Sequence, residues 1–163
     1  MKSIITSHNK SLCEPNPDST KPCNCRQQIC PLDGKCRTAA IVYRATATTD
    51  DGTEAVDYIG STEAEFKLRL ANHKYSFNKI TQRSATKLSQ HVWELKEEGR
   101  SIDIKWKIQR KSRPYQCGSR KCDLCTSEKY EILKSDPSST LNRRTEIASK
   151  CMHRAKFKLR NLK

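Results

Sequence analysis

Nine cysteines run through the chain, and two pairs of them have spacings typical of metal ligands. Cys30 and Cys36 form a C-x5-C pair, and Cys122 and Cys125 form a C-x2-C pair. Thiolates at such spacings bind Zn²⁺, which takes four ligands in a tetrahedral structural site. The first residues lack the apolar stretch of a secretory signal, so we expect a reducing compartment in which cysteines stay as thiols. The two pairs together therefore predict one structural zinc site.

A third pair of ligands lies near the end of the chain. Cys151 and His153 are alternative zinc ligands, so the site could combine three cysteines with one histidine. The other cysteines are spare ligands or buried thiols at Cys23, Cys25 and Cys117, and a free thiol at Cys13.

Four further polar residues have the chemistry to act on a phosphodiester. Arg69 and His73 are four apart and share one helix face. An arginine there can clamp a phosphate, and a histidine can orient water or move a proton. Glu128 could ligate a hard divalent ion such as Mg²⁺, whereas Asn142 is ambiguous when it is considered alone. Taken singly, each also has an ordinary structural explanation as a solvated helix face, a helix-terminal carboxylate or a turn residue.

A hairpin is predicted before this helix. Residues 39–47 are β-branched and apolar, residues 55–60 form a return strand, and Asp51-Gly52 between them is a strong turn signal. The hairpin brings Tyr43 and Tyr58 together.

The remaining elements predict a small α+β domain. Thr62 and Glu65 have the spacing of a capping box for the helix that carries Arg69, and residues 86–99 predict a second helix that ends at Gly99. Residues 102–109 alternate as in a half-buried strand, and helices are expected over 126–135 and about 143–157. We therefore expect a three-stranded, mostly antiparallel sheet flanked by helices over residues 30–163, after a polar linker or irregular cysteine-bearing arm over residues 1–29.

The charge is strongly positive and unevenly distributed. The net charge is +14, and residues 105–163 hold 17 Lys or Arg against 5 Asp or Glu. Such a basic surface favours a nucleic acid partner, whose phosphates it would neutralise. A solvated basic tail or an anionic membrane surface would also explain the charge. No run approaches the roughly 20 apolar residues of a membrane span, so none is expected.

The order of these residues resembles the signature of the GIY-YIG nucleases. Ile41-Val42-Tyr43 and Tyr58-Ile59-Gly60 are followed by the polar residues described above, and the resemblance spans residues 38–160. Ile41 stands where the family has glycine, whereas Tyr43 is kept. The segments that look like the endonuclease domain of Penelope-like retroelements are residues 30–36, 66–77, 86–99, 104–108, 121–129, 141–146 and 150–159.

This resemblance implies a metal-dependent DNA endonuclease that nicks the target of a retroelement. Its implied catalytic residues are Tyr43, Tyr58, Arg69, His73, Glu128 and Asn142, with Glu128 holding Mg²⁺ or Mn²⁺. Tyr43 would take or relay the proton of the attacking water, and its ordinary pKa of about 10 requires the metal or Arg69 to lower it. The resemblance further implies DNA as partner, a nuclear location and a reverse transcriptase domain in the parent polypeptide. The rival interpretations are a non-catalytic zinc-containing nucleic-acid-binding module and a repair-type GIY-YIG nuclease that acts on distorted DNA.

Overall fold

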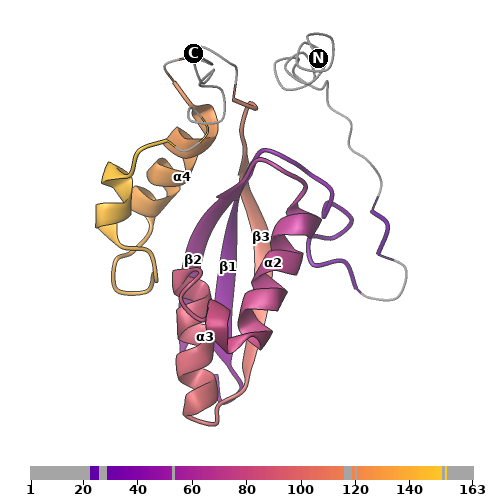
Figure 1. Ribbon diagram of the computed structural model, residues 1–163, viewed down its shortest axis with the longest axis vertical. Helices are drawn as coiled ribbons and strands as arrows, with labels where there is room; N and C mark the ends of the chain where they lie inside the picture. Colours follow the sequence, from indigo (N-terminus) through magenta and orange to yellow (C-terminus); the bar gives the residue numbers. More distant parts are fainter. Residues whose placement is uncertain are drawn as a thin grey trace, which may run out of the picture.

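The described part of the chain forms one three-stranded sheet with helices on both of its faces (Figure 1). The computed structural model describes residues 23–25, 29–52, 54–115, 119, 121–151 and 153. In chain order the elements are β1 (Ile41–Thr49), β2 (Ala55–Thr62), α2 (Phe66–Asn78), η1 (Ile80–Gln82), α3 (Lys87–Glu97), β3 (Ile102–Lys111), α4 (Asp123–Lys134) and η2 (Arg144–Ala148). The predicted α+β class and the three-stranded antiparallel sheet are confirmed.

β1 is the central strand, because the strand order is β2-β1-β3 and both pairings are antiparallel. The turn between β1 and β2 contains Gly52 at a φ of 67°, a conformation that glycine adopts without steric penalty. Tyr43 lies opposite Gly60, and Ala45 lies opposite Tyr58. Side chains alternate between faces along a strand, so Tyr43 and Tyr58 project from the same face of this hairpin.

Each face of the sheet has its own apolar core. Helices α2 and α3 cover the face from which Tyr43 projects (Figure 1), where the predicted alternation of β3 also places its apolar side chains. The buried residues of this core include Tyr43, Phe66, Leu70 and Leu88. Helix α4 covers the opposite face, where the buried residues include Val42, Ile59, Leu124 and Ile132. The sheet therefore separates α2 from α4.

Helix α3 matches its prediction at both ends. The Thr86 hydroxyl accepts a hydrogen bond from Ser89 N at 3.0 Å, which makes Thr86 the N-cap. After the helix, Gly99 has a φ of 73°, Gly99 N donates to Lys96 O, and Arg100 N donates to Leu95 O. This pair of bonds is a Schellman motif, which satisfies the last carbonyl groups of the helix.

The predicted boundaries of the other helices need correction. The Thr62–Glu65 capping box was wrong: Thr62 lies in β2, and Glu65 precedes α2 without a side-chain cap because its carboxylate binds Arg37 at 3.0 Å. Helix α4 begins at Asp123 rather than at residue 126. Within the described residues, the helix expected over 143–157 is the short η2, which ends at Ala148 because Ser149 has extended backbone angles.

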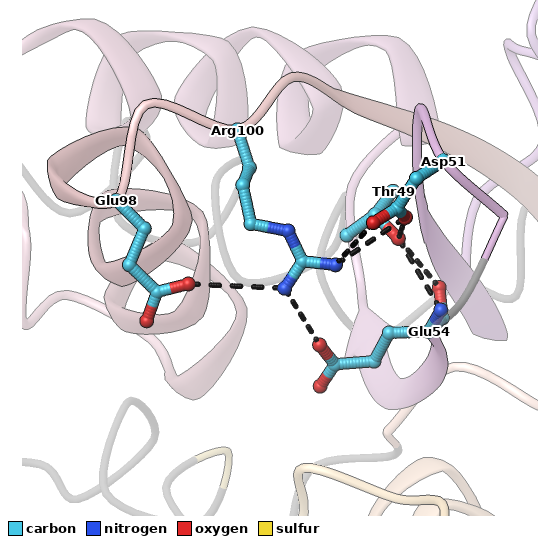
Figure 2. Close-up of polar contacts among 5 residues, drawn as sticks. All are labelled: Thr49, Asp51, Glu54, Glu98 and Arg100. Carbon is cyan, nitrogen blue, oxygen red and sulfur yellow. Dashed lines mark hydrogen bonds and ion pairs between the residues drawn. The ribbon is translucent and has the colours of Figure 1, made fainter.

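At the hairpin end of the sheet, one arginine joins the turn to the α3–β3 connection (Figure 2). Arg100 forms ion pairs with Asp51 at 3.2 Å, Glu54 at 3.3 Å and Glu98 at 3.7 Å. Asp50 N also donates to Ser101 O, so the backbone of the two loops is joined as well. None of the helices among the described residues combines the length and apolar composition needed to cross a membrane.

Gly99→Ala is expected to lower the free energy of unfolding by about 1–2 kcal/mol, because this is the steric cost of the left-handed conformation for a residue with a Cβ atom. Thermal or urea unfolding measures the change. Gly99→Asn is the matched control, because asparagine tolerates this conformation better and should retain more stability. Equal stability of both variants and the wild type would contradict this description of the helix end.

Candidate active site

Tyr43 is fully buried at the centre of a group of polar side chains. Its hydroxyl oxygen lies 3.0 Å from Arg69 Nε and 2.7 Å from His73 Nε2. An arginine N–H can only donate, so the phenol oxygen accepts from Arg69 and its own O–H can donate to a neutral imidazole. The spacing of Arg69 and His73 along α2 thus brings both side chains to one phenol.

The backbone of Gly60 makes room for this phenol. A Cβ atom at Gly60 would lie 2.5 Å from the Tyr43 hydroxyl and 2.7 Å from Cζ of the same ring. Both distances are far inside van der Waals contact, so any side chain here would displace Tyr43. Gly60 is required by this close approach, across the pairing of β1 with β2.

Aromatic rings fix the orientation of Tyr43. Its ring centroid lies 5.2 Å from Phe66 and 5.8 Å from Trp106, both within the range of favourable aromatic pairs. Tyr58 adds a second phenol on the same face, with its ring 6.1 Å from the His73 ring and near enough to the Arg69 guanidinium to raise the pKa of that group. The structure therefore brings Tyr43, Tyr58, Arg69 and His73 together.

Burial sets the protonation of these groups. It raises the pKa of Tyr43 to about 12, although the positive charge of Arg69 and its hydrogen bond act in the opposite direction. Burial also lowers the pKa of His73 to about 3, and the nearby Arg69 charge adds to the shift. At neutral pH the phenol and the imidazole are both neutral. Arg69 alone does not lower the Tyr43 pKa below its ordinary value, because burial outweighs it.

Glu128 approaches from the other side of β2. It lies in the second turn of α4, rather than in the first turn as predicted, because α4 begins at Asp123. Burial raises the pKa of Glu128, while a hydrogen bond with Ser61 and the charge of Arg69 lower it. The Glu128 charge also acts on Tyr43 and Tyr58. The polar side chains therefore lie on both sides of the edge strand β2, next to Gly60.

Asn142 is held tightly against β2. Its side-chain oxygen accepts from Ile59 N at 2.6 Å, and its Nδ2 donates to Ile59 O at 3.0 Å and to Glu146 at 3.0 Å. Both amide hydrogens are thus used within the chain. Because β2 is an edge strand, the N–H and C=O of Ile59 would otherwise have no hydrogen-bond partner in the sheet. These contacts assign Asn142 a positioning role for the strand, and its role toward water or phosphate stays a prediction.

The cysteines form two clusters, and the single site predicted from Cys30, Cys36, Cys122 and Cys125 is corrected. The first cluster contains Cys23, Cys25, Cys30 and Cys36, and the second contains Cys122, Cys125, Cys151 and His153. In each cluster all ligand atoms lie within 4.8 Å of one another. The predicted pairs do lie at the same end of the antiparallel pair β1–β3. Each pair nevertheless has partners of its own: Cys30 and Cys36 lie with Cys23 and Cys25 just before them, whereas Cys122 and Cys125 lie with Cys151 and His153, in the segment after η2.

The first cluster has the dimensions of a thiolate metal site. The Cys36 sulfur lies 3.7 Å from that of Cys25 and 3.5 Å from that of Cys23. Tetrahedral Zn–S bonds of about 2.3 Å place sulfurs about 3.8 Å apart, whereas a disulfide needs about 2.05 Å. The cluster is joined to the start of α2, because Lys67 N donates to Cys36 O at 2.7 Å.

The second cluster sits at the start of α4. Cys122 is the residue that precedes the helix and Cys125 lies in its first turn. His153 Nδ1 lies 3.2 Å from the Cys125 sulfur, and that sulfur lies 3.5 Å from Cys151. The other imidazole nitrogen lies 3.9 Å from a Glu63 carboxylate oxygen, the type of contact that orients a metal-bound histidine. Two cysteine-rich groups that fit a metal such as zinc are thus present, whereas Cys13 and Cys117 lie outside the described residues.

Several contributors were not expected from the sequence. Ser61 follows the Tyr58-Ile59-Gly60 tripeptide directly and binds Glu128, and Glu63 binds His153. The alternation of β2 gives a signal for Ser61, which must face away from Tyr58. Asn72 is a further case, because its spacing of three from Arg69 puts it beside Arg69 on α2, where both line one pocket.

Stability should depend on the neutral state of His73. The unfolded chain binds a proton near the ordinary histidine pKa, but the folded chain resists it until about pH 3. Stability present above pH 6.5 is therefore lost as the pH falls from 6.5 toward 3, by up to about 1.4 kcal/mol per pH unit. Urea unfolding from pH 7 to 4 should show a flatter dependence for His73→Gln than for the wild type. An unchanged slope, compared with the control His91→Gln, would contradict this environment for His73.

Purified protein should contain about two zinc ions per chain if both clusters are metal sites. Cys25→Ser and Cys125→Ser should each lose about one ion, and the double variant both, as measured by mass spectrometry of the metal content. One shared ion in the wild type, lost completely in either single variant, would restore the single-site interpretation and contradict the grouping seen here.

Comparisons with protein-family models, with curated proteins and with solved structures found no match to this chain. Its function must therefore be inferred from its own residues and their geometry.

Proposed function

We propose that this chain is a metal-dependent DNA endonuclease domain of the GIY-YIG type that nicks DNA. The observation that carries the proposal is the convergence at Gly60 of five polar side chains from four separate elements: Tyr43, Tyr58, Arg69, His73 and Glu128. A core tyrosine needs none of these partners, and buried polar groups are costly to assemble. The resemblance of the sequence to this nuclease family had selected the same residues.

Arg69 is suited to stabilise the charge that develops on the phosphate during attack. Its guanidinium stays charged, the Tyr43 phenol fixes its position through a hydrogen bond, and the Tyr58 phenol lies nearby. A preorganised cation in a water-poor site needs no reorganisation when the charge appears. Arg69 is therefore assigned to the non-bridging phosphate oxygens.

Tyr43 and His73 are suited to relay a proton. The hydroxyl of Tyr43 can accept a proton from the attacking water while it passes its own proton to His73 Nε2, 2.7 Å away. A relay of this kind avoids a free phenolate, which the pKa of about 12 disfavours at neutral pH. The pKa of His73 is about 3 in the free chain, so the relay requires the negative charge of the bound phosphate to raise it, and His73 afterwards releases the proton to solvent. The water oxygen forms a bond to phosphorus, the bond to the leaving oxygen breaks, and that oxygen takes a proton from solvent.

Glu128 is the residue that would hold Mg²⁺ or Mn²⁺. Its carboxylate is desolvated enough for burial to raise its pKa, so a cation would replace solvation that it lacks. Mg²⁺ needs only one or two carboxylates, because waters and substrate phosphate complete its shell. When bound, the ion would supply positive charge to a phosphate oxygen and to the leaving oxygen.

DNA is the proposed partner because of the net charge of +14 and its concentration in residues 105–163. The finer proposal follows from the resemblance to Penelope-like retroelements: a nuclear enzyme makes the target nick, within a parent polypeptide that carries a reverse transcriptase. The GIY-YIG fold is likewise proposed from the resemblance, together with the β-β-α-α-β-α order of the elements.

A non-catalytic zinc-containing nucleic-acid-binding module is the second candidate. The two cysteine clusters and the charge favour it as strongly as they favour a nuclease. It gives no reason for Arg69 and His73 to meet at a buried phenol, however. A repair-type nuclease would share the active site and differ in its substrate.

Glu128→Ala is expected to abolish nicking of a supercoiled plasmid in Mg²⁺ while DNA binding stays within about threefold of the wild type, because one carboxylate contributes little to phosphate contact. Gel electrophoresis measures nicking, and fluorescence anisotropy measures binding. Glu94→Ala, an exposed carboxylate on α3, is the matched control and should nick normally. A wild-type chain that binds DNA but fails to nick it with Mg²⁺ or Mn²⁺ would favour the binding module.

A further inference from the structure

A small pocket opens beside the proposed catalytic residues on α2. It has a volume of about 200 Å³ and lies between α2, η1 and the start of α3. Its lining includes Arg69, Asn72, His73, Tyr75, Gln82 and Thr86. A pocket for a drug-sized ligand typically measures 300–1,000 Å³, and one water takes up about 30 Å³. This pocket is therefore sized for one small planar group rather than for a whole ligand.

The pocket presents unused amides. Asn72 and Gln82 are both exposed, and neither side chain makes a hydrogen bond within the described part of the chain. An amide offers a donor and an acceptor side by side, the pattern needed for the edge of a nucleobase. A phosphate would use only the donors and would be repelled by the two carbonyl oxygens. The amides therefore favour a base over an anion.

An exposed aromatic ring stands at the same pocket. Tyr75 is 54% exposed and lies in the last turn of α2. The ammonium group of Lys79 lies 5.3 Å from the centroid of its ring. Exposed aromatic side chains next to basic groups are the usual stacking surface for unpaired bases, because the ring meets the base and the cation meets its phosphate. This role gives a reason for an exposed tyrosine that the fold itself does not need.

We propose that this pocket binds one unpaired nucleobase of the DNA strand being cut, with Tyr75 stacked on the base and with Asn72 and Gln82 bonded to its edge. The inference rests on the proposed nuclease function. Arg69 lines the pocket and also donates a hydrogen bond to the Tyr43 hydroxyl. The phosphate next to the bound base would therefore lie beside the proposed catalytic residues. In a duplex the base must leave the stack, at a cost that is smallest at a mismatch or a bubble. DNA with an unpaired base at the cleavage position is therefore the preferred substrate class.

The binding test uses duplexes that carry one 2-aminopurine, a base whose fluorescence rises when it is unstacked, either fully paired or within a small bubble. The protein is the full chain with Glu128→Gln, so that the DNA is not cut. It should bind the bubble about tenfold more tightly than the paired duplex, and Tyr75→Ala should remove about tenfold of affinity for the bubble. Asn72→Ala and Gln82→Ala should each weaken binding to the bubble by a larger factor than binding to the paired duplex, where the base must first leave the stack.

Matched controls lie outside the pocket. Asn78→Ala is on the same helix, and Leu133→Ala removes a half-exposed apolar side chain on α4. Both should bind as the unmodified chain does. Equal binding of bubble and paired duplex, or pocket variants that behave like these controls, would overturn the base-binding inference.

Nicking measured in parallel on chains with intact Glu128 separates the two proposals. If the wild type nicks both substrates equally and Tyr75→Ala nicks like the wild type, the pocket inference fails and the nuclease proposal stands. If the pocket variants lose binding to the bubble while the wild type never nicks, the base-binding pocket stands and the nuclease proposal fails.

Discussion

The contact of the Tyr43 phenol with Arg69, His73 and the backbone at Gly60 is the constraint on which the rest of the site depends. The phenol is buried completely, its oxygen meets a cation and an imidazole, and no Cβ atom fits beneath it. Because β1 is the central strand, Tyr43 is fixed by pairings on both sides. Helix α2 and the edge strand β2 therefore pack around this ring, and the ring sets the positions of Arg69 and His73.

The two cysteine clusters give the site its second constraint. The first is joined to the backbone at the start of α2, which carries Arg69 and His73, and the second includes the start of α4, which carries Glu128. The two helices lie on opposite faces of the sheet, so no direct packing between them sets the separation of Arg69 and Glu128. Metal ions in both clusters would fix each helix to the sheet independently. Such metals would then affect the proposed catalysis through the positions of the helices and would take no part in the chemical step.

The sequence was informative wherever local pattern decides the structure. The alternation of β3, the Asp51-Gly52 turn and the end of α3 at Gly99 are local, and each appears as predicted. Prediction from the sequence failed where a residue distant in the chain competes for a local interaction. Glu65 binds Arg37 instead of capping α2, and Cys122 and Cys125 lie with Cys151 and His153, which are 26 and 28 residues from Cys125, rather than with Cys30 and Cys36. The hydrogen bonds of Asn142 to β2 likewise join residues 83 apart, a separation at which no spacing rule applies.

The single-turnover rate of plasmid nicking by Tyr43→Phe tests the central claim most directly. This change removes one oxygen atom and keeps the ring, so the aromatic contacts to Phe66 and Trp106 should persist and the variant should fold. If the phenol relays the proton of the attacking water, the rate should fall by about 100-fold or more while DNA affinity stays unchanged. A Tyr43→Phe variant that nicks at the wild-type rate would contradict a catalytic role for the tyrosine at the centre of this site.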